Sequence, residues 1–184
     1  MKTILLTLTA LVSGLGIAGL SGRQDPAQDM PKPGPEHERI LNLAGTWDAV
    51  ITITAPDGSG QQSKGSLRTE KLGAFHTVDH FEGELMGMPF HGHGVNSYCP
   101  VRKQHVTFWS DSMSPSPILL TGTYDESKKE LRMSGESAGM SGKLEKMRTV
   151  IKIESDDRYV FSLFGPGPDG EEMQHMTIEY TRKK

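Results

Sequence analysis

The chain has 184 residues, of which 23% are charged and 35% are hydrophobic, and its formal net charge is −3. This length allows one ordinary domain, or at most two small ones. The weak negative charge and the absence of a long basic run argue against a nucleic-acid-binding protein, which would need cations for phosphate contacts. The single cysteine, Cys99, excludes an intrachain disulfide framework and every zinc or iron–sulfur site that needs several cysteines.

The first 22 residues have the pattern of a secretory signal peptide. Lys2 precedes an apolar run from Ile4 to Val12, and small residues dominate from Ser13 to Gly22. We therefore expect residues 1–22 to be removed and the protein to be exported, to the periplasm or the extracellular space. The alternative is an uncleaved anchor. No later stretch is long and apolar enough to span a membrane as a helix.

Two short segments come before the main domain. Residues 23–35 are rich in proline and polar side chains, which predicts a flexible tether. Pro35 and the acidic residues that follow it are typical of the first turn of a helix. Ile40, Leu41 and Leu43 would form the apolar side of this helix, and Gly45 would end it. Residues 36–184 are then expected to form a single domain.

From Gly45 onward the hydrophobic period changes to two, which is typical of β-strands. Trp47, Ala49, Ile51 and Ile53 alternate with Asp48, Val50, Thr52 and Thr54. Nine further strand-like runs, separated by short turns, are Ser63–Leu72, Phe75–Leu85, Pro89–Tyr98, Gln104–Asp111, Ile118–Tyr124, Glu130–Glu136, Glu145–Glu154, Arg158–Phe164 and Met173–Thr181. Short connections indicate antiparallel neighbours. About ten such strands predict an all-β, up-and-down barrel with one short N-terminal helix, and a two-sheet sandwich is the alternative.

The start of the first strand resembles a known fold group. Gly45-Thr46-Trp47 resembles the G-x-W motif of the calycins, which include lipocalins, fatty-acid-binding proteins and nitrobindins. In that group a basic residue of the last strand packs over the tryptophan, and Arg182 is in the matching place.

Five separated segments also resemble, in order, the bacterial domain-of-unknown-function family 1579. They are PGPEHERILNLAGTWD (33–48), FEGELMGMPFHGHG (81–94), FWSDSM (108–113), TGTYDESKKEL (121–131) and GPGPDG followed by MTIEYTRKK (165–170 and 176–184). The resemblance implies a calycin-like barrel. It implies no reaction, so it identifies no catalytic residue.

Four side chains form a candidate metal site on one face of a predicted hairpin. A two-residue turn at 86–87 would place His80 opposite His93 and Glu82 opposite His91. Imidazoles and a carboxylate are ligands for zinc or copper. The aromatic residues of these strands lie on the other face, which we expect to be the interior. The histidine face is therefore interpreted as a polar outer surface, and no metal or other cofactor is predicted.

His175 is near the position where nitrobindin-type barrels have a haem-ligating histidine. Met176, Ile178 and Tyr180 form the apolar set of the last strand, so the alternation predicts that His175 points outward. Haem binding is therefore not expected.

The inward face predicts a ligand pocket of mixed character. Its candidate lining residues are Phe81, Phe90, Gly92, Gly94, Tyr98, Trp109, Asp79 and Asp111. Acids inside a barrel need partners, for which Arg148 is one candidate. Gly92 and Gly94 have no side chains beside the aromatic residues, which suggests empty volume.

The favoured hypothesis is an exported barrel that binds a small, apolar or amphipathic molecule. One alternative is an enzyme with an interior carboxylate, such as Asp111, as general base. Another is a structural or interaction module whose barrel is filled by side chains. Residues 135–139 fit the G-x-S-x-G nucleophile elbow around Ser137, but no helical pattern follows, so we interpret the match as chance. None of these hypotheses predicts the oligomeric state. Enzymatic activity is less favoured than ligand binding without catalysis.

Overall fold

The structure, a computed structural model, describes residues 31–55, 57–139 and 142–184. Pro33–Lys184 form one compact unit. The predicted signal peptide and most of the predicted tether lie outside the described residues. Within the described part, no helix has the length and apolar character needed to cross a bilayer.

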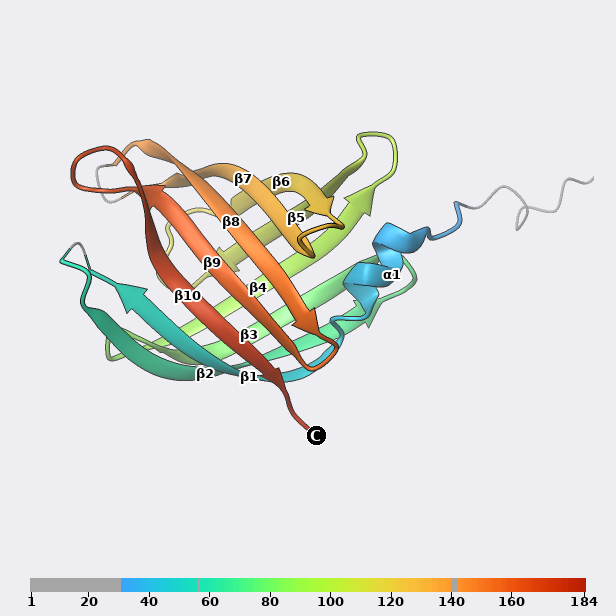
Figure 1. The fold of residues 1–184 in the computed structure, drawn as a ribbon, viewed down its shortest axis with the longest axis horizontal. Coiled ribbons are helices and arrows are strands. Elements are labelled where there is room, and N and C mark those ends of the chain that lie inside the picture. The colour runs from blue at the N-terminus through green and yellow to red at the C-terminus, as the bar shows by residue number, and fades with distance from the viewer. Residues whose placement is uncertain (1–30, 56, 140–141) are drawn as a thin grey trace, which may run out of the picture. The chain divides into compact units, whose positions relative to one another are not determined.

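The compact unit is a closed barrel of ten strands with one helix, α1 (Pro35–Leu41) (Figure 1). The strands are β1 (Gly45–Thr54), β2 (Gly60–Leu72), β3 (His76–Leu85), β4 (Met88–Cys99), β5 (Gln104–Asp111), β6 (Ile118–Asp125), β7 (Glu130–Ala138), β8 (Leu144–Ser155), β9 (Arg158–Pro166) and β10 (Glu172–Arg182). Each strand pairs antiparallel with its neighbours in sequence, and β1 pairs with β10. The predicted up-and-down barrel is confirmed. The sandwich alternative is wrong, because every strand has two partners.

The β3–β4 turn shows how local geometry sets the register. Met86 and Gly87 both have positive φ, 52° and 77°, as the central residues of a type I′ hairpin turn require. The tight turn places His80 opposite His93 and Glu82 opposite His91. The predicted register is therefore confirmed.

Trp47 is the centre of the core at the end of the barrel where α1 lies. It is completely buried, and its indole Nε1 donates a hydrogen bond of 3.0 Å to the Leu43 carbonyl. The Tyr159 ring meets it edge-on at a centroid distance of 4.7 Å. The Arg182 guanidinium carbon is 4.1 Å from the indole centroid, and the same guanidinium donates to the Ala44 carbonyl at 2.8 Å. The predicted contact between Trp47 and Arg182 is confirmed.

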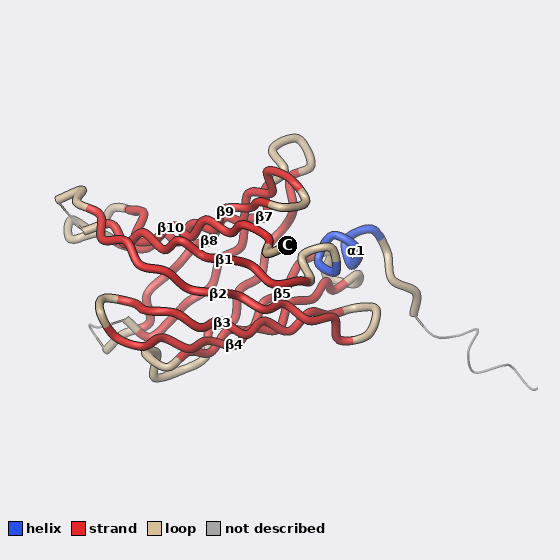
Figure 2. The backbone as a smooth tube through the Cα atoms, turned by 90° about the horizontal axis from the view of Figure 1, so that it is seen from below, coloured by secondary structure: helices blue, strands red, loops and turns tan. Residues whose placement is uncertain are grey.

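Helix α1 covers part of this end of the barrel (Figure 2). Its buried residue His37 accepts a hydrogen bond from the Gly34 amide at Nδ1, over 3.0 Å. The His37 ring packs edge-on against Phe75 and Tyr98, with centroid distances of 5.2 and 5.5 Å. The sequence predicted the helix from its apolar residues, whereas this buried histidine also attaches it to β4 and to the residue before β3.

Trp47→Ala should lower the free energy of unfolding by about 3–5 kcal/mol, because it removes a large buried aromatic side chain. Urea unfolding followed by circular dichroism measures the loss. Val101→Ala, at a side chain that is 91% exposed, is the control. A loss below about 1 kcal/mol in Trp47→Ala would contradict the central role of this residue.

Candidate functional site

The interior of the barrel has an apolar side and a polar side. Strands β1 and β8–β10 contribute mainly apolar inward side chains, namely Ile51, Ile151, Phe161, Leu163, Met176 and Ile178. Strands β2–β5 contribute a polar cluster near the helix-covered end, namely Thr69, Thr77, Asp79, Asn96 and Thr107. A partly apolar molecule in this interior would find both kinds of surface.

Asp79 is the centre of the polar cluster. Its two carboxylate oxygens accept hydrogen bonds from the Thr69 hydroxyl, at 2.7 Å, and from the Asn96 side-chain amide, at 2.8 Å. The Asn96 amide oxygen in turn accepts from the Thr107 hydroxyl at 2.8 Å. The cluster thus joins four adjacent strands through side chains alone.

Burial raises the pKa of Asp79, and the hydrogen bonds from Thr69 and Asn96 only partly oppose this effect. Desolvation disfavours the charged carboxylate, so the acid keeps its proton to a higher pH than an exposed aspartate does. Asp79 also raises the pKa of the stacked Tyr159 and Tyr180, for which burial is the larger cause. Together these groups form the polar, largely buried end of the interior.

Two buried polar atoms of the interior wall have no hydrogen-bond partner among the described residues. They are Nδ1 of His105, which is 2% exposed, and the hydroxyl of Thr149, which is fully buried. Both residues lie on one cross-strand row, in which Gly122 and Met133 come between them. Buried polar groups in proteins are almost always satisfied by protein, water or a ligand.

The apolar side also keeps accessible surface. Ile151, Phe161 and Leu163 face inward near the middle of their strands, yet each is only half-buried. Trp47 and Ile51, at the helix-covered end and in the adjoining wall, are fully enclosed. Inward side chains that remain accessible indicate that the wall borders space on this side.

Trp109 fills the volume that the sequence suggested was empty. A Cβ atom on Gly92 would lie 2.3 Å from Cζ2 of Trp109, and one on Gly94 would lie 3.1 Å from Cε3. The glycines therefore make room for the indole and not for a ligand, which corrects that expectation. Phe81 is buried, and Phe90 is half-buried at a ring distance of 5.7 Å from it.

Asp111 faces inward, and both of its oxygens are engaged. Oδ2 accepts from Nε1 of Trp109 at 2.9 Å and from the Ser114 hydroxyl at 3.1 Å. Oδ1 accepts from the Met113 and Ser114 amides at 2.9 and 2.8 Å. The carboxylate orders the loop after β5 and fixes the indole over the glycines, which is a structural role and not that of a free base.

The candidate metal residues lie on the outer face, as the alternation of β3 and β4 predicts. The Nδ1 atoms of His80 and His93 are 3.1 Å apart, and Nε2 of His80 is 3.3 Å from a Glu70 oxygen. His91 and Glu82 are exposed beside them. Among the residues that the structure describes, no group of three or more His, Cys, Asp or Glu side chains is arranged to hold a metal ion.

His175 does not point outward, which corrects the prediction. The register of β10 against β9 shifts between Gln174 and Met176, so His175 occupies a β-bulge. Its Cδ2 and Nε2 atoms would be 3.2 Å from a Cβ on Gly165, an inward-facing position. The ring edge with Nε2 therefore rests on Gly165.

Two further sequence candidates have structural explanations. Ser137 lies in β7 opposite Glu145 of the antiparallel strand β8, so it does not occupy the strand-to-helix turn of a nucleophile elbow. Arg148 points to the outer face, where its guanidinium lies 3.9 Å from the Phe164 centroid and binds Glu172. It is not a partner for the interior acids, which corrects that expectation.

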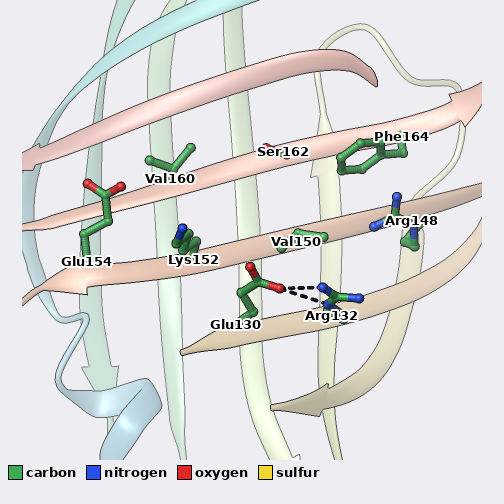
Figure 3. A pocket seen from close by; sticks show the side chains of 9 residues that line it. All are labelled: Glu130, Arg132, Arg148, Val150, Lys152, Glu154, Val160, Ser162 and Phe164. Carbon is green, nitrogen blue, oxygen red and sulfur yellow. Dashed lines mark hydrogen bonds and ion pairs between the residues drawn. The ribbon is translucent and has the colours of Figure 1, made fainter. Parts of the chain in front are cut away.

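The outer face of β7–β9 has a groove of about 520 Å³ (Figure 3). Arg132 in this groove binds Glu130, and Arg148 binds Glu172. Both guanidinium groups of the groove are thus already paired with a glutamate carboxylate. A second pocket, of about 300 Å³, lies at the helix-covered end and includes His105 in its lining.

Sequence reasoning missed Thr69, Asn96, Thr149 and His105 as interior polar residues. All four lie on the same strand faces as the apolar residues that were identified. Their alternation with outward residues was the available signal.

Residues 32–182 match the family described as "Protein of unknown function (DUF1579)". The comparison with curated proteins gave no match. Rv2717c from M. tuberculosis has a similar structure, with a TM-score of 0.63 and 13% identity over 83% of this chain and 100% of that chain. S-type phycobiliprotein lyase CPES from Guillardia theta has a TM-score of 0.54 and 10% identity, covering 81% of this chain and 93% of that chain. A redesigned β-barrel bound to DFHBI, mFAP1, has a TM-score of 0.42 and 16% identity over 78% and 97% of the two chains.

Gly92→Ala should destabilise the protein more than Gly94→Ala, because the added methyl group would overlap the Trp109 ring more severely at position 92. We expect a loss of roughly 1–3 kcal/mol for Gly92→Ala and a smaller loss for Gly94→Ala. Urea unfolding of both variants measures the difference. Equal stability of Gly92→Ala and the wild type would mean that the indole does not occupy this space.

His105 should make stability depend on pH. Burial lowers the pKa of His105 to about 4, with a smaller contribution from Arg39. His105 is therefore protonated near pH 6.5 in the unfolded chain but only near pH 4 in the folded protein. Between these pH values the unfolded chain binds one more proton, so the free energy of unfolding decreases as the pH falls. His105→Gln should remove up to about 3 kcal/mol of this loss.

Urea unfolding at pH 7, 6, 5 and 4 measures this effect. His91→Gln, on the exposed outer face, should keep the pH dependence of the wild type. The same dependence in His105→Gln would show that other groups cause it.

Proposed function

We propose that this chain, which belongs to the DUF1579 family, binds a small, partly apolar molecule inside its barrel. One observation carries the proposal: the interior has an accessible apolar side facing a hydrogen-bonded polar side, and a buried hydroxyl on the wall lacks a partner. An amphipathic molecule would contact both sides at once.

The unpartnered Thr149 hydroxyl supports an occupant with a polar group. A buried hydroxyl without a hydrogen bond costs about 1–3 kcal/mol. The Met133 and Leu163 side chains that flank Thr149 on the neighbouring strands offer no strong acceptor. A hydroxyl, carbonyl or amide of a ligand, or a water beside it, would offset this cost.

The Asp79 cluster supports an uncharged polar end. Each Asp79 oxygen already accepts a hydrogen bond, and the burial that raises the pKa of Asp79 also disfavours any other charged group beside it. A carboxylate at this place would face the buried acid. A neutral polar group would fit the cluster, and the rest of the molecule would lie against Ile151 and Phe161.

The enzyme alternative has less support. Asp111, the candidate base, accepts four hydrogen bonds, one from Trp109 and three from the loop that follows β5. A general base needs a free lone pair directed at a substrate proton.

The proposed place of action is outside the cytoplasm. The support is the pattern of residues 1–22, a short cationic start followed by an apolar run and small residues.

Binding of the neutral apolar probe N-phenyl-1-naphthylamine tests the proposal. We expect fluorescence enhancement with about micromolar affinity in the wild type. Ile151→Trp would fill the space on the apolar side and should weaken binding at least about tenfold. Val150→Trp, one residue away on the outer face, is the matched control and should bind as the wild type does.

Native mass spectrometry of protein purified from its own cells would identify a retained ligand. If the wild type binds no probe, or if Ile151→Trp unfolds the barrel while Val150→Trp does not, the interior is packed and the proposal is wrong. Equal loss of binding in both variants would also contradict it.

A further inference from the structure

The pocket at the helix-covered end lies beside α1 and shares His105 with the interior wall. Its volume is about 300 Å³, and it lies between α1 and strands β4–β6. Its main lining groups are Glu36, Arg39, Tyr98, His105, Tyr124 and Glu126.

The wall of the pocket contains an unsatisfied polar atom in an aromatic setting. His105 is 2% exposed, its Nδ1 has no partner, and its ring lies 5.1 Å from that of Tyr98.

A protein carboxylate occupies the mouth of the same pocket. Arg39 of α1 binds Glu126, 87 residues further along the chain, and its guanidinium carbon lies 3.9 Å from the Tyr124 ring centroid. The Arg39 side chain is only 20% exposed, whereas that of Glu126 is 76% exposed. Packing therefore holds the Arg39 guanidinium in place. The exposed Glu126 carboxylate contributes little binding free energy, so another carboxylate can replace it.

We propose that this pocket binds a small aromatic carboxylic acid. Its carboxylate would replace Glu126 on Arg39, and its ring would lie among Tyr98 and Tyr124. A planar guanidinium prefers bidentate contact with a carboxylate. Glu36 at the pocket makes a doubly charged phosphate unfavourable, and the volume suits a ligand of roughly ten to fifteen heavy atoms.

Isothermal titration with 4-hydroxybenzoate tests the proposal, and 4-hydroxybenzamide serves as its uncharged counterpart. Glu126→Gln should raise the affinity for 4-hydroxybenzoate about three- to tenfold, because it removes the competing carboxylate. Arg39→Met should lower it at least about tenfold. Neither change should alter binding of the amide by a comparable factor.

The outer pair of Arg148 and Glu172 provides a matched control, because Arg148 also lies 3.9 Å from an aromatic centroid while bound to a glutamate. Glu172→Gln changes the net charge equally and should leave the affinity unchanged. Ile151→Trp should also leave it unchanged, which separates this site from the barrel interior. The proposal is wrong if 4-hydroxybenzoate binds neither the wild type nor Glu126→Gln, or if Glu172→Gln gives the same gain.

Discussion

The contact between Trp47 and Arg182 is the interaction on which the rest of the structure depends. It joins the first strand to the last, and it does so where the indole also meets Tyr159 and hydrogen-bonds the segment after α1. A guanidinium over an indole is favourable when both are shielded from water. Because β1 and β10 are thereby held as neighbours, no strand of the barrel has a free edge. The polar cluster, the accessible apolar side and the pocket under α1 all require this closed wall.

Most of the fold can be predicted from the sequence because strand alternation and turn residues are local features of the chain. Alternation in β1 identified its inward residues, and the pair Met86-Gly87 identified a tight turn that set the register of β3 and β4. Asp79, Trp109 and Asp111 were placed on the inward face for the same reason. Strand ends were less certain: β2 begins at Gly60 and not at Ser63, because strand pairing with β1 extends the ladder beyond the apolar residues.

The site was harder to predict because its details are not local. The volume beside Gly92 depends on the rotamer of Trp109, which Asp111 fixes from the end of β5. The direction of His175 depends on a β-bulge that simple alternation cannot detect. Arg148 lies on a strand where both faces contain partly apolar residues, so its outward direction follows only from packing on Phe164. Each failure reflects a contact between strands.

The pairing of β1 with β10 has a consequence for how the chain acquires its structure. Trp47 and Arg182 are far apart in sequence, so their contact has a large loop-closure entropy and forms late. During synthesis, nearly the whole barrel sequence leaves the ribosome before the strand that completes the wall is available. The hairpins β2–β3 and β8–β9 can form early, but the sheet stays open and its first strand unpaired on one side. A chain in that state is threadable through a narrow translocation channel, whereas the closed barrel is not. Under the export proposed above, late closure would keep the polypeptide in this threadable state for as long as its synthesis lasts.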